Sequence, residues 1–168
     1  MNPGGLQSLV GDCFLGEHLF AVDSQRRLAL PKSWRKADAG GNHFFLLPGR
    51  ERSLQLVPAA IFGELLQKLR KVSFADAQAA GAMATVGSMA QDASCDKQGR
   101  FSLTPKLMEH AGITDKALLL GAVTTIQIWE PSRWEAQRMD SDTGLNVLQA
   151  VQERADDLTE VFRRAVRN

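Results

Sequence analysis

The sequence predicts an α+β fold made of two tandem β-hairpin repeats, with short flanking helices and a C-terminal helix. One segment occurs twice: an Asp-x-x-x-Arg turn leads into a short apolar strand, which is followed by Pro-Lys and a short helix. Asp96 follows Asp23 by 73 residues (96 − 23), and Arg100 follows Arg27 by the same interval (100 − 27). Two further apolar strands and another helix follow each copy in the same order. A repeated series of this kind indicates an internal duplication.

Length and composition place the chain among ordinary globular proteins. It has 168 residues, of which 44% are hydrophobic and 23% charged, so it fits one compact domain or two small intertwined halves. The net charge of +1 excludes a bulk polycation, and binding to nucleic acid would need a local basic patch or many copies of one. Residues 1–10 do not resemble a signal peptide, and no apolar run approaches membrane-spanning length. We therefore expect a cytoplasmic protein with no membrane association.

Residues 1–13 are Gly-rich and are expected to form a flexible lead-in to the first repeat, residues 14–80. The elements of this repeat are expected in the following order: strands over 18–22 and 26–30, one or two helical turns over 33–36, strands over 44–47 and 54–57 that form a hairpin, and a helix that ends near Lys71. The helix is assigned from apolar residues with a helical spacing, which are Ile61, Phe62, Leu65, Leu66 and Leu69.

The second repeat is expected to span residues 81–139, after a linking stretch that is rich in Ala and Gly. That stretch, Phe74 to Met89, is expected to begin as a helix and to become a strand near residues 82–89. In the second turn Gln98-Gly99 forms a tight reversal, because glycine tolerates a positive φ. The elements after this turn are expected in the following order: a half-buried strand over 101–104, a helix over 106–111, strands over 117–120 and 126–129, and a helix over 131–138.

Residues 140–168 have no counterpart in the first half and are expected to form an amphipathic helix. Its apolar seam consists of Leu148, Val151, Ala155, Leu158, Phe162 and Ala165. The seam is too short for a self-sufficient coiled coil. Two interpretations remain open: the helix docks on its own body or on a neighbouring subunit, or residues 144–168 bind a separate protein partner.

No stretch of the sequence announces catalysis. The three histidines lack any recognisable spacing for metal ligands or a general base, and no nucleophile elbow, phosphate loop or dinucleotide fingerprint is present. Cys13 and Cys95 are not expected to form a disulfide, because nothing in the sequence indicates an oxidising compartment. We therefore expect no enzyme activity, no metal and no cofactor.

The two Asp-x-x-x-Arg turns suggest a binding function instead. In one interpretation the Asp and the Arg simply pair and fix the turn. In the other, the pair orients a guanidinium outwards towards phosphates or guanine edges. Basic residues gather near both turns, which favours the second interpretation. The candidate DNA-binding residues are Asp23, Arg26, Arg27, Lys32, Arg35, Asp96, Lys97, Arg100 and Lys106.

These segments resemble the MraZ family over roughly residues 14–138. The resemblance rests on Val22-Asp23-x-x-x-Arg27-Leu28-Ala29-Leu30-Pro31, on Asp96-Lys97-Gln98-Gly99-Arg100, and on the later Leu120-Gly121 and Ile128-Trp129. It implies a bacterial transcriptional regulator of the cell-division and cell-wall gene cluster, associated with the nucleoid. It also implies an AbrB/MazE-like swapped-hairpin barrel, assembly into a ring-shaped homo-oligomer, and binding to double-stranded DNA at short direct promoter repeats.

The family's DNA-contacting motif is Asp-x-x-x-Arg, so the resemblance assigns DNA contacts to Asp23, Arg27, Asp96 and Arg100. The first turn departs from the family pattern, because Gln25-Arg26 stands where the family has Lys-Gly. Either a non-glycine residue takes an unusual φ there, or the turn differs. An alternative function from another class is an antitoxin-like or scaffold protein, which would hold a protein partner through the C-terminal helix.

Overall fold

The computed structural model describes residues 12–38 and 42–165, with the backbone alone described over 155–165. Most of the expected flexible lead-in, residues 1–11, lies outside the described residues. The chain divides into two compact units, one that ends at Trp134 and one that begins at Glu135. Each unit is described by itself below.

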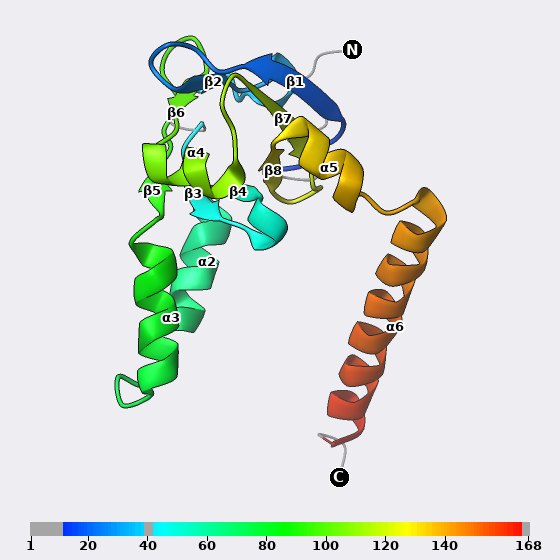
Figure 1. Ribbon diagram of the computed structural model, residues 1–168. Helices are drawn as coiled ribbons and strands as arrows, with labels where there is room; N and C mark the ends of the chain where they lie inside the picture. The colour runs from blue at the N-terminus through cyan, green and yellow to red at the C-terminus, as the bar shows by residue number, and fades with distance from the viewer. Residues whose placement is uncertain (1–11, 39–41, 166–168) are drawn as a thin grey trace. The chain divides into compact units, whose positions relative to one another are not determined.

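The first unit is built on an antiparallel six-stranded sheet (Figure 1). Its strands lie in the order β1-β7-β8-β4-β3-β5. Their bounds are β1 Glu17–Ala21, β7 Lys116–Gly121, β8 Ile126–Trp129, β4 Leu54–Pro58, β3 Phe44–Pro48 and β5 Gln91–Asp92. The expected hairpin between the strands near 44–47 and 54–57 is confirmed, with Leu46 opposite Leu56.

A second, two-stranded antiparallel sheet joins β2 (Arg27–Ala29) to β6 (Arg100–Ser102). We call it the β2–β6 ribbon. Leu28 lies opposite Phe101 at its centre, and Arg27 and Arg100 each begin one of its strands. Since the strands are antiparallel, the two Asp-x-x-x-Arg turns lie at opposite ends of the ribbon.

The two halves of the sequence exchange strands with each other. In the six-stranded sheet β1 pairs with β7 and β5 pairs with β3, so the first strand of each repeat joins a strand of the other repeat. The two repeats also meet at the centre of that sheet, where Gln55 of β4 lies opposite Gln127 of β8. Because Gln55 and Gln127 occupy equivalent positions in the two repeats, the strand order reads the same from either edge. An approximate two-fold axis therefore relates the halves.

The expected swapped-hairpin barrel is not a closed barrel in the part of the chain that the structure describes. Among the described strands, β1 and β5 are the edges of the six-stranded sheet, and the β2–β6 ribbon is a separate sheet. Closure would require the edge strands to pair through a continuous hydrogen-bond ladder. β5 has only two residues, which is too short to extend such a ladder. The α+β class is confirmed, and each repeat contains one antiparallel hairpin, β3–β4 in the first and β7–β8 in the second.

Helices follow the strands at the places where the apolar pattern changes period. The short helices η1 (Lys32–Trp34) and α4 (Pro105–Ala111) follow the ribbon strands in the two repeats, and α2 (Ala59–Leu69) and α5 (Pro131–Gln137) follow β4 and β8. A further short helix, η3 (Arg50–Arg52), lies in the turn between β3 and β4.

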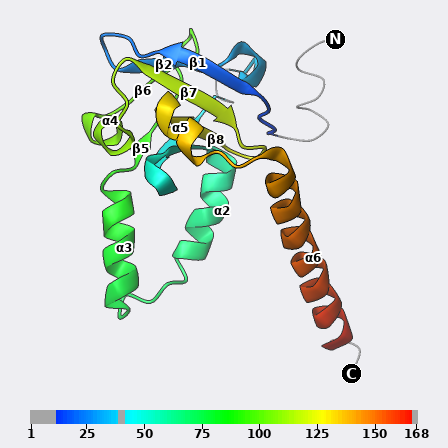
Figure 2. The same ribbon diagram turned by 45° about the vertical axis from the view of Figure 1, so that its right-hand side comes forward.

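The linking stretch corrects one expectation. It forms the helix α3 (Ala77–Gly87), and the strand expected near residues 82–89 begins only at Gln91. Asp76 caps α3 by accepting a hydrogen bond from the Ala79 N–H. Neither α2 nor α3 fully buries a residue, and in Figures 1 and 2 both helices lie at the opposite end of this unit from the β2–β6 ribbon.

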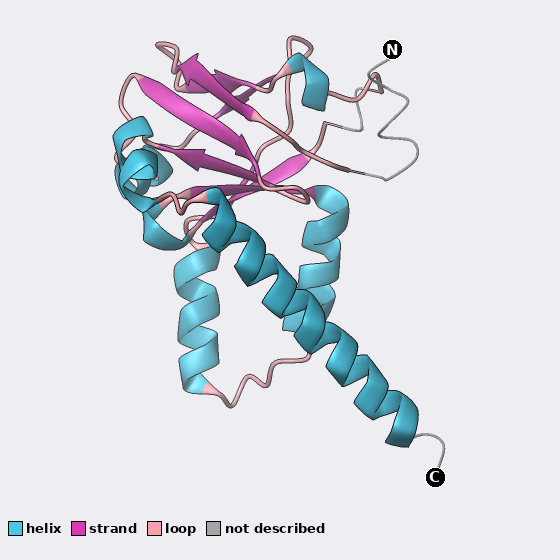
Figure 3. Cartoon of the chain, turned by 90° about the vertical axis from the view of Figure 1, so that its right-hand side faces the viewer, coloured by secondary structure: helices cyan, strands magenta, loops and turns pink. Residues whose placement is uncertain are grey.

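One apolar core lies between the ribbon and the six-stranded sheet, and it draws on both repeats. Its fully buried members come from nearly every strand of the first unit and from α4; they include Phe14, Leu28, Leu30, Leu46, Leu56, Phe101, Leu103, Leu107, Leu119 and Ile128. Figure 3 shows the strands of this unit gathered at one end. The core therefore fixes the ribbon as part of a rigid body.

The second unit contains the helix α6 (Ser141–Ala165), as expected for the C-terminal region. Leu145 and Leu148 are each 65% exposed, and Val151 is 55% exposed. No helix among the described residues is both long and apolar enough to cross a membrane.

Candidate nucleic-acid interface

The β2–β6 ribbon has one apolar face and one polar face. Leu28 and Phe101 are 0% and 2% exposed, and they point into the core. Because side chains alternate along a strand, Arg27 and Arg100 point the other way, away from the core. The side chains of Arg27 and Arg100 are 27% and 33% exposed. The ribbon thus presents both turn arginines on the same outward face.

Each turn is held together by its own aspartate. Oδ1 of Asp23 accepts hydrogen bonds from the backbone N–H groups of Gln25 and Arg27, both at 2.8 Å. Its Oδ2 accepts a hydrogen bond from Nε of Arg27 at 2.7 Å. The carboxylate therefore stabilises the backbone of the turn and the side chain of the arginine at once.

The second turn repeats these contacts. Oδ1 of Asp96 accepts from the backbone N–H groups of Gln98 and Arg100, and its Oδ2 accepts from Nε of Arg100 at 3.0 Å. The same hydrogen bonds in both turns show that the repeated sequence motif encodes a repeated geometry.

Hydrogen bonding lowers the pKa of both turn carboxyls below the ordinary value of 3.8. For Asp23 and for Asp96 the largest cause is the backbone N–H of the turn arginine, and the guanidinium adds to it. Both aspartates are therefore ionised at neutral pH, and each one neutralises part of the charge of its arginine.

Of the three guanidinium nitrogens of Arg27, only Nε contacts Asp23. Among the described residues, its two terminal nitrogens Nη1 and Nη2 make no hydrogen bond. In the second turn Nη2 of Arg100 donates to Oε1 of Gln98 at 2.5 Å. The far edge of each guanidinium is thus available, wholly at Arg27 and partly at Arg100, for a ligand outside the protein.

The residue before each arginine has a left-handed backbone. Gly99 has a φ of 73°, and Arg26 has a φ of 56° at the equivalent position of the first turn. The first turn therefore keeps the geometry of the second although it lacks the glycine. Of the two alternatives left open by the sequence, the structure shows the non-glycine residue in an unusual φ.

Arg35 lies at the second turn, whereas its place in the sequence suggested the first. A Cβ atom on Gly99 would collide with Nε of Arg35, so the Arg35 side chain covers that glycine. Nε of Arg35 also donates to the carbonyl oxygen of Leu30 at 2.7 Å. The pairing of β2 with β6 brings the end of the first repeat's arm beside the second turn, which the sequence order does not reveal.

Arg26 links the first turn to the second repeat. Its Nε donates to the carbonyl oxygen of Leu103 at 3.3 Å, and its own carbonyl oxygen accepts from the Leu103 N–H at 2.7 Å. Each turn is thus joined to the end of the other repeat's strand. Sequence reasoning missed the carbonyl groups of Leu30 and Leu103 as partners, because a backbone group leaves no signal in a sequence.

The three lysines among the predicted site residues are exposed. Lys32 lies in η1, Lys97 in the second turn and Lys106 in the first turn of α4. Within the part of the chain that the structure describes, none of their side chains makes a hydrogen bond or an ion pair. Sequence reasoning did not single out Gln98 as a site residue, although its side chain holds Arg100.

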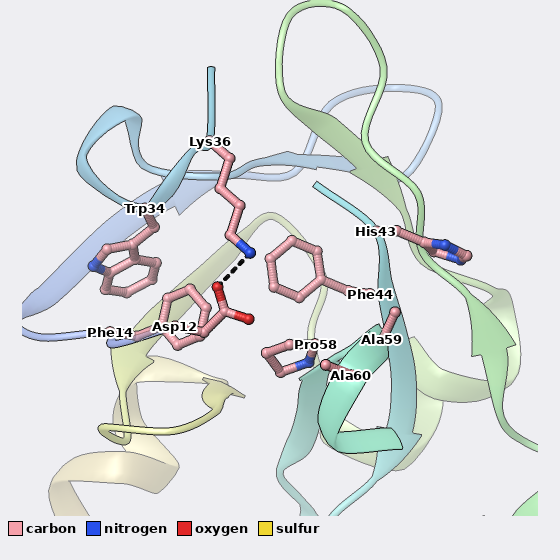
Figure 4. A pocket seen from close by; sticks show the side chains of 9 residues that line it. All are labelled: Asp12, Phe14, Trp34, Lys36, His43, Phe44, Pro58, Ala59 and Ala60. Atoms are coloured by element: carbon pink, nitrogen blue, oxygen red, sulfur yellow. Dashed lines mark ion pairs between the residues drawn. The ribbon is translucent and has the colours of Figure 1, made fainter. Parts of the chain in front are cut away.

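A small pocket lies beside helix η1 (Figure 4). It has a volume of about 110 Å³ and lies between the rings of Phe14, Trp34 and Phe44. An ion pair of 2.6 Å between Lys36 and Asp12 crosses it. Pockets for drug-sized ligands usually measure about 300–1,000 Å³. This pocket is therefore too small for such a ligand.

Comparison with known proteins gives a consistent result. Residues 13–83 and 88–157 each match the family model described as "MraZ protein, putative antitoxin-like". A protein of Finegoldia magna named "Transcriptional regulator MraZ" is 30% identical over 128 residues, which are 76% of this chain and 88% of the relative.

Two more relatives carry the same name. The protein of Thermomicrobium roseum is 34% identical over 124 residues, or 74% of this chain and 86% of the relative. The protein of Herpetosiphon aurantiacus is 34% identical over 122 residues, which are 73% of this chain and 84% of the relative. The similarity covers both repeats and most of each relative.

Proposed function

The chain belongs to the MraZ family, and we propose that it is a transcriptional regulator that binds specific sequences of double-stranded DNA and has no enzyme activity. The name of these relatives supports regulation of transcription. The proposal places the DNA contact on the outward face of the β2–β6 ribbon and on the two turns that flank it.

One observation carries this assignment. The guanidinium groups of Arg27 and Arg100 lie on the same outward face of a rigid ribbon, and the Nε atom of each donates a hydrogen bond to the aspartate of its own turn. This hydrogen bond fixes the direction of the arginine side chain before DNA binds, so less side-chain entropy is lost on binding. An arginine held through Nε can still use its Nη atoms for a bidentate contact to guanine or phosphate. A two-stranded ribbon also fits the width of the major groove.

The remaining site residues are assigned supporting roles. Lys32, Lys97 and Lys106 supply phosphate contacts, and Arg26 and Arg35 tie each turn to the other repeat. Asp23 and Asp96 orient Arg27 and Arg100 and do not themselves touch the negatively charged DNA.

Assembly completes the proposal. The net charge of +1 gives one chain a weak general attraction for DNA. We propose that copies of the chain, each a swapped-hairpin pair of repeats, assemble into a ring-like homo-oligomer on short direct promoter repeats. Linked sites gain affinity through effective concentration when the DNA repeats match the spacing of the copies. The expected target is the cell-division and cell-wall gene cluster, at the nucleoid in the cytoplasm.

The test is a mobility-shift titration with DNA from upstream of the protein's own coding region. Arg27→Ala and Arg100→Ala should each weaken binding about 5- to 150-fold, since a bidentate arginine contact contributes about 1–3 kcal/mol. Arg138→Ala is the matched control, because it also removes an exposed arginine from an ion pair, here with Glu135, and lies far from the ribbon in sequence. Wild-type affinity should fall steeply with salt.

Unchanged binding by the Arg27→Ala, Arg100→Ala double variant, with its oligomeric state intact, would overturn the proposal. An equal loss of DNA affinity in the Arg138→Ala control would show that the effect comes only from the removal of a positive charge.

A second candidate function rests on the exposed apolar residues of α6, namely Leu145, Leu148 and Val151. Their spacing of three residues places them close together on the helix surface. Under this alternative the protein is an antitoxin-like or scaffold protein that binds a protein partner through residues 144–168. Deleting those residues separates the two functions: DNA binding persists and a co-purifying protein is lost if α6 is the partner site.

A further inference from the structure

The β2–β6 ribbon has its own two-fold relation. Equivalent residues of the two repeats, Leu28 and Phe101, lie opposite each other at its centre. Arg27 lies opposite Ser102, and Arg100 lies opposite Ala29. The backbone hydrogen bonds obey the same relation: the Leu30 N–H donates to the Gly99 carbonyl and the Leu103 N–H donates to the Arg26 carbonyl, both at 2.7 Å.

This axis passes through the Leu28/Phe101 pair and stands perpendicular to the ribbon. It therefore relates Arg27 to Arg100 by a rotation of half a turn, on the face that points away from the core. B-DNA has two-fold axes perpendicular to its helix, and these axes relate bases on opposite strands. A protein with two-fold symmetry that lies in a groove accordingly meets equivalent bases on the two strands.

We propose that each chain reads two guanines on opposite strands of one short DNA site, one through Arg27 and the other through Arg100. This inference rests on the proposed function and specifies the DNA that the site recognises. Guanine is the base chosen, because its O6 and N7 atoms together accept two hydrogen bonds from one guanidinium. Nη1 and Nη2 supply those donors while Nε stays on the aspartate.

The register limits the separation of the two guanines. Diagonal neighbours across an antiparallel pair have Cα atoms roughly 7–8 Å apart. Each guanidinium is held by the aspartate of its own turn, and the turns lie at opposite ends of the ribbon. With a rise of about 3.4 Å per base pair, the two guanines should be roughly two to four base-pair steps apart.

The inference is compatible with direct promoter repeats. Direct repeats describe how successive sites follow one another along the DNA and so concern different copies of the chain. The opposite-strand pair lies inside each site and concerns the two halves of one copy. A direct repeat can contain such a pair in every unit.

The experiment uses the full chain and the shortest duplex that it retains from its own upstream DNA. Each guanine of both strands is replaced in turn by 7-deazaguanine, which lacks the N7 acceptor, and affinities are measured by mobility shift. Two guanines on opposite strands should be sensitive within each site, each replacement costing about 5- to 150-fold.

Arginine-to-lysine variants then assign the two contacts. Lysine keeps the charge but cannot make the bidentate contact. Arg27→Lys should make binding indifferent to 7-deazaguanine at one of the two guanines, and Arg100→Lys should do so at the other. Gln98→Ala, which changes an exposed side chain and frees Nη2 of Arg100, should alter sensitivity only at the guanine assigned to Arg100.

Sensitive guanines on the same strand, or loss of the same guanine's sensitivity in both lysine variants, would overturn the inference and leave the proposed function standing. If the wild-type chain retains no upstream DNA at all, the proposed function fails together with it. The circular-dichroism spectra of the variants check that all of them are folded.

Discussion

Arg26 and Gly99 hold the same left-handed backbone with very different side chains. A left-handed φ costs a residue with a Cβ roughly 1–2 kcal/mol, whereas glycine adopts it freely. In the first turn the hydrogen bond from Nε of Arg26 to Leu103 offsets part of that cost. In the second turn the missing side chain leaves room for Arg35.

Gly99→Ala should lower the free energy of unfolding by about 1–3 kcal/mol, because the new Cβ adds strain at a φ of 73° and displaces Arg35. Urea denaturation measures it. Gly63→Ala is the matched control: Gly63 lies in α2, and a Cβ added there would meet open space, so alanine should stabilise the chain by about 0.5–1 kcal/mol. A loss of stability at Gly99 that persists in full when Arg35→Ala is added would contradict the role given to Arg35.

The turn aspartates should make stability depend on acid. The folded-state pKa values of Asp23 and Asp96 lie below 3.8, so their contribution is fully present above that pH and is lost as the pH falls through the lower folded values. Asp23→Asn and Asp96→Asn should destabilise the protein at pH 7, because an amide offers Nε of the arginine a poorer partner. The difference from wild type should shrink below pH 3.8, as thermal melts at several pH values would show; a difference that stays constant would refute this.

The contacts within each turn could be predicted from the sequence, and those between the turns could not. Four residues separate Asp23 from Arg27, so their pairing follows from local geometry. Arg35 and Gly99 meet only because β2 pairs with β6, and that pairing depends on the packing of the whole core. The outward direction of Arg27 likewise follows from the burial of Leu28, which the alternation of the strand did indicate.

At the scale of the element, helices with similar caps have different importance. α4 is capped by Thr104, whose Oγ1 accepts from the Leu107 N–H, and it buries Leu107 and Ala111 in the core. α3 is capped by Asp76 and fully buries none of its residues. Helix α4 is therefore coupled to the core, whereas α3 is held mainly by its own backbone hydrogen bonds.

Thr104→Ala should therefore lower global stability by about 0.5–2 kcal/mol, the usual cost of an N-cap. Asp76→Ala should change the free energy of unfolding, measured by urea denaturation, by less than about 0.5 kcal/mol. It should instead speed amide hydrogen exchange at the start of α3. Equal global losses for the two variants would show that α3 is coupled to the core after all.

The strands near residues 44–48 and 54–58 could be predicted because each is an apolar run bounded by turn residues. The linking stretch was misjudged, because alanine and glycine give almost no apolar periodicity from which to choose between helix and strand. Alanine's high helix propensity and the cap at Asp76 decided the outcome in favour of the helix α3.

At the scale of the whole molecule, the pairing of strands between the two repeats makes each half dependent on the other. β1 pairs with β7, β2 with β6 and β3 with β5, so neither repeat satisfies its strand hydrogen bonds alone. The duplication was visible in the sequence. The exchange of strands was not visible there, because the paired strands lie far apart along the chain and no local sequence pattern indicates which strands pair.

Expressed separately, residues 1–89 and 90–168 should not fold as monomers, because each would leave its strand edges and half of the core exposed. When mixed, they should form a one-to-one complex that recovers the near-ultraviolet circular dichroism of the intact chain. A half that melts cooperatively as a monomer would contradict the strand exchange. Analytical ultracentrifugation distinguishes that monomer from a homodimer of one half.

The placement of both turns on one polypeptide has a consequence for how this surface can evolve. In a homodimer with one hairpin per subunit, any mutation in the hairpin gene would alter both ends of the ribbon together. Here a single codon change alters one end and leaves the other untouched, as the arginine at position 26 and the glycine at position 99 already illustrate. Each end can therefore be tuned separately by selection.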